Sequence, residues 1–75
     1  MTIGERLRAL REENKIVLNQ SQLGKILHKS QRAISRHETG DSHLQDDDII
    51  AYCLYYGVSA DYILGLPEGL KYIKR

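Results

Sequence analysis

The feature that most constrains this chain is the stretch of residues 18–40, which predicts two short helices joined by a tight turn. Asn19 suits the N-cap of the first helix, because its side-chain oxygen can accept a hydrogen bond from an unpaired N–H of the first turn. Leu23, Ile26 and Leu27 then recur at helical spacing on one face. The first helix of the stretch is therefore expected to be short and amphipathic.

A second helix is predicted after the next candidate N-cap, Ser30, and runs from about Gln31 to Glu38. Gly40 follows at the position where many helices end in a left-handed residue. His28 and Lys29, between the two helices, interrupt the apolar pattern. The stretch as a whole therefore predicts a helix-turn-helix unit.

The second helix of the unit divides into an apolar side and a polar arc. At about 100° per residue, Ala33, Ile34 and His37 share one side. The opposite arc consists of hydrogen-bonding residues: Gln31, Arg32, Ser35, Arg36 and Thr39. Arg can bond a guanine edge through two donors, and Gln can bond adenine in the same bidentate way. A solvated helix face is the simpler interpretation of such an arc alone, but the capped helix and turn before it favour a recognition helix that enters a DNA major groove.

At these residues the sequence resembles the Cro/repressor-type (xenobiotic-response-element) helix-turn-helix family of bacterial and bacteriophage DNA-binding regulators. The resemblance covers roughly Ile3 to Leu66. The segments that carry it are Leu18-Asn19-Gln20, Leu23, Ser30-Gln31, Ile34 to Gly40 and Leu54 to Gly65. It implies an all-α fold, a compact bundle of about five helices in which helices 2 and 3 form the helix-turn-helix. It also implies a DNA-binding domain over residues 1–66, followed by a short C-terminal tail over residues 67–75.

The sequence departs from the family pattern at the turn. His28 stands where the family usually has Gly, and Lys29 stands where it has an apolar residue. His tolerates a positive φ better than most other residue types, and the alkyl stem of Lys29 can cover apolar surface while its ammonium stays in water. The loop from Asn14 to Leu18 is about two residues longer than usual. These departures bear on docking geometry and leave the expected fold unchanged.

Together, the resemblance and the polar arc assign candidate DNA contacts. The base-reading candidates are Gln31, Arg32 and Arg36, with Ser35 secondary. The phosphate-contact candidates are Asn19, Gln20, Lys25, Lys29 and Ser30. The expected partner is double-stranded DNA, bound by a homodimer on an inverted repeat, because one short helix covers only a few base pairs.

The charge distribution agrees with this assignment, although the net charge is only +1. Residues 20–37 contain four bases and no acid, whereas residues 38–68 contain seven acids and no Lys or Arg. Positive charge is thus concentrated on the helix-turn-helix, as phosphate contact requires. The acidic block predicts a face that avoids DNA.

The first helix is predicted over residues 2–13, where Thr2 and Glu5 form a capping-box pattern. Arg11 resembles the family arginine that reaches a glutamate late in the recognition helix, here Glu38. A partly buried Arg11–Glu38 pair would attach the first helix to the recognition helix. Two independent surface charges are the alternative.

The fourth helix is predicted to begin at three aspartates, Asp46, Asp47 and Asp48, which are favourable beside its partial positive charge. The apolar run from Ile49 to Tyr56 follows it. The expected inward stripe is Ile49, Cys53 and Tyr56, with Tyr52 at its edge. The surplus apolar residues Ile50, Leu54 and Tyr55 suggest a protein interface, unless the whole helix is buried within the monomer.

The fifth helix is predicted to be capped by Ser59 and to run through Leu64, with Tyr62, Ile63 and Leu64 closing the core. Gly65 and Pro67 end it. Residues 68–75 are a basic and apolar tail that could dock on a partner, contact DNA or fray.

Several classes of function are not expected. The lone cysteine, Cys53, precludes an intrachain disulfide and fits a reducing cytoplasm. No apolar run is long enough for a bilayer, and the N-terminus lacks a signal-peptide pattern. His28, His37, His43 and Cys53 have no metal-site spacing, and His37 is interpreted as a packing residue. With no nucleophile beside a positioned base, neither an enzyme nor a cofactor is expected.

The alternative function belongs to a different class. The low net charge, the acidic half and the apolar fourth helix also suit a protein-binding module of the same fold. Such a module would be a bacteriophage antirepressor that captures a repressor, or an antitoxin-like partner.

Overall fold

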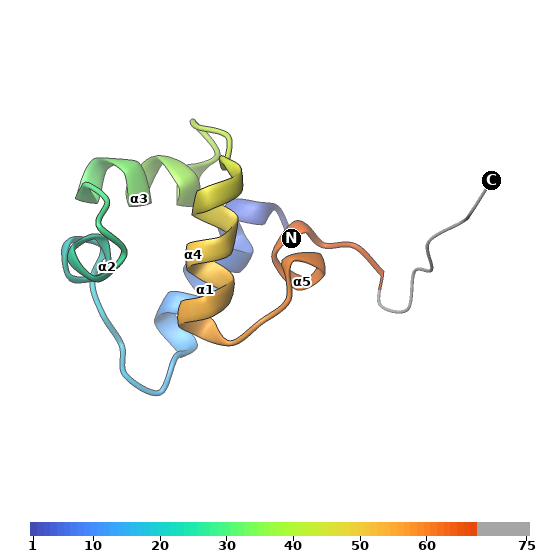
Figure 1. The fold of residues 1–75 in the computed structure, drawn as a ribbon, viewed down its shortest axis with the longest axis horizontal. Coiled ribbons are helices and arrows are strands. Elements are labelled where there is room, and N and C mark those ends of the chain that lie inside the picture. The colour runs from blue at the N-terminus through green and yellow to red at the C-terminus, as the bar shows by residue number, and fades with distance from the viewer. Residues whose placement is uncertain (68–75) are drawn as a thin grey trace.

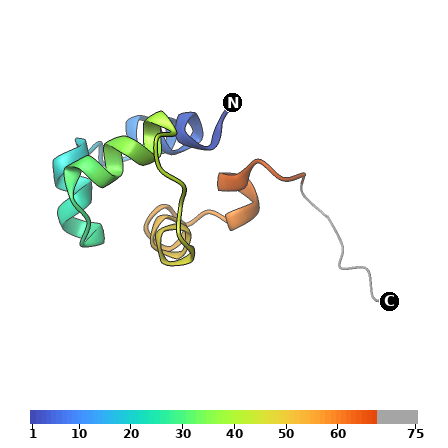
Figure 2. The same ribbon diagram turned by 90° about the horizontal axis from the view of Figure 1, so that it is seen from above.

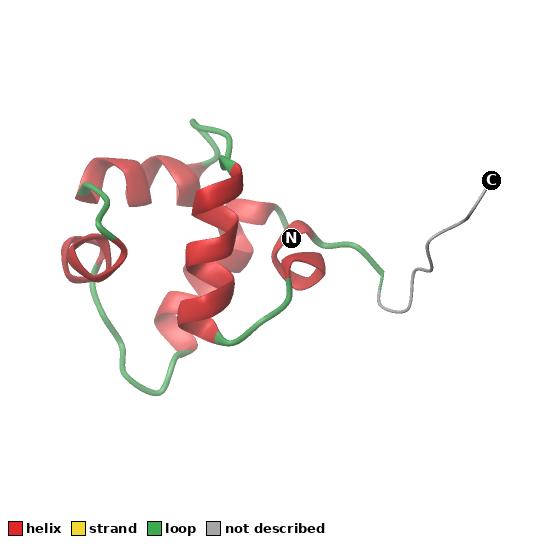
Figure 3. Cartoon of the chain, viewed as in Figure 1, coloured by secondary structure: helices red, strands yellow, loops and turns green. Residues whose placement is uncertain are grey.

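The computed structural model describes residues 1–67, which form five helices and no strand (Figures 1 and 3). The helices are α1 (Ile3–Glu13), α2 (Gln20–Leu27), α3 (Gln31–Thr39), α4 (Asp46–Tyr56) and α5 (Ala60–Leu64). The all-α fold with a helix-turn-helix at α2 and α3 is confirmed. The tail predicted over residues 68–75 lies outside the described residues.

Local hydrogen bonds explain where the first two helices begin. At α1, the Glu5 N–H donates to Thr2 Oγ1 at 3.1 Å, and the Thr2 N–H donates to the Glu5 carboxylate at 2.8 Å. At α2, Asn19 and Gln22 make the same reciprocal pair at 2.8 and 2.9 Å. Each pair satisfies two backbone donors that the helix leaves unpaired. The first capping box was predicted, whereas the second was missed because only Asn19 was considered.

The helices pack so that α3 forms one edge of the molecule. In Figure 1, α3 runs along the top, α2 is seen end-on beside it, and α4 crosses in front of α1. Figure 2 shows α1 and α3 together on one side of the molecule, with α4 on the other. The α3 helix therefore has its inner side against the bundle and its outer side exposed.

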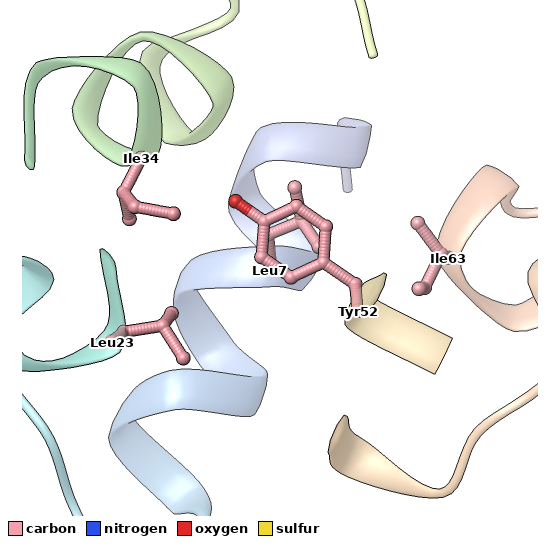
Figure 4. Packing of buried hydrophobic residues seen from close by; sticks show 5 residues of the cluster. All are labelled: Leu7, Leu23, Ile34, Tyr52 and Ile63. Atoms are coloured by element: carbon pink, nitrogen blue, oxygen red, sulfur yellow. The ribbon is translucent and has the colours of Figure 1, made fainter. Parts of the chain in front are cut away.

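The core is one small cluster to which every helix contributes one residue (Figure 4). These residues are Leu7, Leu23, Ile34, Tyr52 and Ile63, each exposed by 1% or less. Because burial of such side chains is the main favourable term in folding, this cluster holds α3 against the rest of the bundle.

The buried face of α4 is shifted by one residue from the predicted inward stripe. Its two buried residues are Asp48 and Tyr52, one turn apart on the same face. The predicted stripe of Ile49, Cys53 and Tyr56 is partly buried, and Cys53 and Tyr56 pack against the core cluster. Both side chains carry a polar group that has a partner inside the domain. The Tyr52 hydroxyl lies beside His37 of α3, and the Asp48 carboxylate is ion-paired with Lys29.

One further core assignment and one interface assignment also need correction. Of the three α5 residues expected to close the core, only Ile63 does so, because Tyr62 and Leu64 are exposed. Tyr55 is partly buried against the core cluster. Only Ile50 and Leu54 of the proposed α4 interface are therefore exposed.

A glycine sets the close approach of α1 to α3. A Cβ atom at Gly4 would lie 2.8 Å from the His37 carbonyl oxygen and closer still to that of Glu38. Real Cβ atoms do not approach backbone so closely, so any side chain here would push the two helices apart. Gly4 thus allows α1 to support the last turn of the recognition helix.

Candidate nucleic-acid interface

The turn between α2 and α3 is compact and well bonded. His28 adopts φ = 58° at the end of α2, the left-handed conformation considered for it from the sequence. The Lys29 N–H donates to the Gly24 carbonyl oxygen at 2.7 Å, and a Cβ at Gly24 would lie 2.6 Å from the Lys29 carbonyl oxygen. The Ser30 hydroxyl then accepts from the Ala33 N–H at 3.0 Å and starts α3. Gly24, which the sequence interpretation did not single out, lets the two helices meet this closely.

The two sides of α3 differ as the periodicity predicted. Ile34 and His37 are buried and Ala33 is partly buried. On the opposite arc, Ser35 is partly buried, and the exposed residues are Gln31, Arg32, Arg36 and Thr39. The exposed arc offers two guanidinium groups and a primary amide on a single helical surface, a donor set that matches base edges in a major groove.

Gln20 connects the exposed arc to the inside of the domain. Its amide oxygen accepts from Gln31 Nε2 at 3.0 Å, and its amide nitrogen donates to Glu38 Oε1 at 3.1 Å. Gln31 is therefore oriented before any ligand arrives. Both glutamines are predicted DNA contacts, but no local pattern indicates that they meet, because eleven positions separate them in the chain.

The structure brings Arg11 and Glu38 together as a two-pronged ion pair. Arg11 Nε and Nη2 donate to the two carboxylate oxygens at 2.8 and 2.9 Å. The side chains are 14% and 4% exposed, and Arg11 also donates to the Leu18 carbonyl oxygen at 3.2 Å. The bonds to Glu38 raise the pKa of the Arg11 guanidinium. The pair therefore joins α1, the loop before α2 and the last turn of α3.

Comparison with known proteins is consistent with this geometry. The profile of the helix-turn-helix domain family matches residues 2–63. The chain belongs to this family. A search among curated proteins finds no match to this helix-turn-helix domain.

Two solved structures of the P22 c2 repressor resemble this helix-turn-helix domain at 34% sequence identity. One is a crystal structure of the repressor with a synthetic operator, with a TM-score of 0.76, covering 85% of this chain and 94% of that chain. The other is a solution structure of the repressor's DNA-binding domain, with a TM-score of 0.74, covering 85% of this chain and 82% of that chain. The family and the phage-repressor type of fold suggested by the sequence are confirmed.

The phosphate-contact candidates of the helix-turn-helix domain are not equally available. Lys25 is exposed on α2. The side-chain oxygens of Asn19 and Ser30 accept cap hydrogen bonds, so a phosphate contact would use the amide NH₂ of Asn19 and the hydroxyl hydrogen of Ser30. The expectation that the Lys29 ammonium stays in water is wrong, because the side chain is 15% exposed and Nζ pairs with Asp48. In the chain without DNA the Lys29 ammonium is thus held by Asp48, and its contact with a phosphate stays a prediction.

Behind α3, the helix-turn-helix domain contains a buried polar cluster that the sequence interpretation missed. His37 Nδ1 lies 3.0 Å from the Tyr52 hydroxyl, and His37 Nε2 lies 3.4 Å from Asp48 Oδ2. Burial lowers the pKa of His37, although the Asp48 carboxylate opposes the shift. Burial also tends to raise the pKa of Asp48, but Lys29 and the Gln45 N–H outweigh it and the net shift is downward. His37 is thus the inward packing residue predicted for it.

Residues 1–67 contain neither a cluster of metal-ligating side chains nor a membrane-spanning helix. No group of three or more His, Cys, Asp or Glu side chains there is arranged to hold a metal ion. No described helix is long and apolar enough to cross a membrane.

Proposed function

We propose that this chain is a sequence-specific DNA-binding transcriptional regulator of the bacteriophage repressor or Cro type, acting in the cytoplasm. The observation that carries the proposal is the exposed arc of α3, where Gln31, Arg32 and Arg36 project from a helix whose other side is buried. The P22 c2 repressor, which shares this fold at 34% identity, is described in complex with an operator.

In this proposal the three side chains contact base edges in the major groove, and Ser35 makes a secondary contact. Arg32 and Arg36 have the donors for guanine, and Gln31, held by Gln20, has the donor and acceptor for adenine. Because Gln31 is already oriented, less side-chain freedom is lost on binding.

The start of α2 provides the phosphate contact. The N–H groups of its first turn and the positive end of its dipole suit an anion. Asn19, Gln20 and Ser30 provide further polar groups near the two helix starts, and Lys25 adds an exposed positive charge. Such contacts fix the register of the protein on the duplex without reading its sequence.

Two copies of the chain would bind an inverted repeat. One α3 spans only nine residues, so a single domain reaches only a few base pairs. Two-fold symmetry of a homodimer then requires two half-sites about one helical turn apart, or multiples of that spacing.

The test is selection from a random duplex library near 0.15 M salt with the purified chain. We expect an enriched palindrome, with log affinity falling against log salt at a slope of about −3 to −8. The double variant Gln31→Ala/Arg32→Ala should lose the selected site. Arg8→Ala removes the same positive charge from an exposed position on α1 and is the matched control. Failure to enrich any sequence, or equal losses in both variants, would contradict the proposal.

A second candidate function is capture of another protein through α4. The observation that favours it is the exposure of Leu54 at 79% and Ile50 at 57% on neighbouring turns. Such a module, acting as an antirepressor or an antitoxin-like partner, would bind through apolar contacts that change little with salt. This function would be supported, and the DNA-binding regulator rejected, by two results together. A stoichiometric protein partner would bind the wild-type chain but not Leu54→Asp, and no duplex would be enriched from the library. Ile26→Asp on α2 is the control for an exposed apolar residue elsewhere.

A further inference from the structure

A single carboxylate, Asp48 in the first turn of α4, lies against both ends of α3. Its Oδ1 pairs with Lys29 Nζ, and Lys29 comes directly before the N-cap of α3. Its Oδ2 lies 3.4 Å from His37 Nε2, and His37 belongs to the last turn of α3. One group on a neighbouring helix thus contacts the residue before the recognition helix and a residue near its end.

The three side chains that meet here are shielded from water. Lys29 is 15% exposed, Asp48 is 11% exposed and His37 is 6% exposed. Charges in such surroundings interact more strongly than charges in water. Losing one member of a buried pair also leaves the other without compensation, so the arrangement resists rearrangement.

Asp48 is itself fixed relative to α4. The Gln45 N–H donates to Asp48 Oδ2 at 2.8 Å, which ties the carboxylate to the start of the helix. One turn later, the Tyr52 hydroxyl lies 3.0 Å from His37 Nδ1. Both nitrogens of the His37 ring therefore face polar groups of α4, and the ring cannot turn without losing one of them.

We propose that Asp48 is a positioning residue that sets the orientation of the recognition helix. A contact at one end of α3 would let the helix swing, whereas contacts at both ends hold its tilt relative to α4. The proposal rests on the proposed DNA-binding function, because bidentate contacts to bases need side chains placed within about 0.5 Å and 10–20°. Loss of the Asp48 charge should therefore weaken binding to the selected duplex about tenfold, the equivalent of one good base contact.

Lys29 has one other possible role, in which it contacts a DNA phosphate and pairs with Asp48 only while DNA is absent. That role predicts the opposite result. Under that role, Asp48→Asn would free Lys29, raise affinity for selected and random duplexes alike, and steepen the salt slope by about 0.9. Positioning predicts lower affinity for the selected duplex, unchanged affinity for random duplexes and an unchanged slope.

The experiment compares Asp48→Asn and Lys29→Met with Asp46→Asn, which removes the same charge from an exposed residue in the same helical turn. Binding to selected and random duplexes is measured by fluorescence anisotropy at temperatures where circular dichroism shows each variant folded. We expect about tenfold weaker binding to the selected duplex for the first two variants and none of this loss for Asp46→Asn. If Asp48→Asn melts below the assay temperature, the double variant Lys29→Met/Asp48→Asn replaces it, because it removes the contact without leaving a buried unpaired charge.

A second measurement needs no DNA. Residual dipolar couplings of amide groups report the angle of α3 to α4 in the free chain, and we expect that angle to change in Asp48→Asn but not in Asp46→Asn. Unchanged couplings in the free protein, or equal weakening of selected and random binding, would overturn the positioning role. If the wild-type chain binds no duplex while the couplings still change, the DNA-binding function fails and the positioning of α3 stands.

Discussion

The Arg11–Glu38 pair gives a stability prediction whose size follows from its geometry. The Glu38 carboxylate accepts three hydrogen bonds, two from Arg11 and one from Gln20. Glu38→Gln keeps one oxygen and replaces the other by an NH₂ group, which must face an N–H donor. At least one charge-assisted bond is then lost, and the guanidinium loses its counter-charge.

The expected cost follows from the burial of both partners. Losing a hydrogen bond to a charged group costs about 1.5–3 kcal/mol, and removing one partner of a fully buried ion pair costs about 3–5 kcal/mol. Arg11 is 14% exposed, so water reaches part of the guanidinium and moderates the effect. We therefore expect Glu38→Gln to lower the free energy of unfolding by about 2–3 kcal/mol. For a domain of this size, that corresponds to a fall in Tm of about 10–20 °C.

Thermal unfolding followed by circular dichroism measures the effect, and α1 offers a matched control. Arg8 and Glu12 form an ion pair of the same residue types, through a single contact and at 66% and 51% side-chain exposure, so Glu12→Gln should cost less than about 0.5 kcal/mol. A double-mutant cycle with Arg11→Ala isolates the interaction. Equal Tm values for Glu38→Gln and Glu12→Gln, or a Glu38→Gln cost that is the same in the Arg11→Ala background, would refute the reasoning.

Three further outcomes are expected. Gly4→Ala should destabilise the domain by about 1–3 kcal/mol in urea titrations, because the added Cβ meets the backbone of α3. Arg32→Ala should cost about 1–3 kcal/mol of specific binding free energy and relax the preference at one base position. Lys25→Ala should weaken binding to all duplexes alike and reduce the salt slope. Gel shifts with selected and random duplexes distinguish the two effects. Burial lowers the pKa of His37 in the folded chain, so the unfolded chain binds a proton at a higher pH than the folded chain does. The free energy of unfolding measured in urea should therefore fall as the pH drops below about 6.5, the ordinary pKa of histidine. This dependence should persist in His43→Gln but disappear in His37→Gln.

Features governed by neighbours in the chain could be predicted from the sequence. Thr2 and Glu5 lie three residues apart, and Ser30 and Gly40 each act on the helix beside them, so their roles follow from local geometry. The division of α3 into buried and exposed sides also follows from local periodicity, because its polar and apolar residues alternate at helical spacing. The roles of Arg32 and Arg36 in reading bases stay predictions.

Features that depend on how helices meet could not be predicted in the same way. Because α4 is apolar all round, its periodicity defines no face, and the burial of Tyr52 depends on finding His37 across the core. The pairing of Lys29 with Asp48 joins residues nineteen positions apart. No local pattern marks either residue, since a lysine and an aspartate are ordinarily surface residues.

The left-handed conformation of His28 lowers the stability of this domain, and a glycine at the same position would restore the lost free energy. A non-glycine residue in that conformation is less favourable than glycine by about 1 kcal/mol, and the total stability of a chain this short is only about 4–11 kcal/mol. His28→Gly would therefore act as a global suppressor. The stability that it adds would offset destabilising substitutions at residues that it does not contact. In an evolving population, chains with glycine at this turn would accept a wider range of substitutions on α3, and so would change their target sequence more readily than chains with histidine.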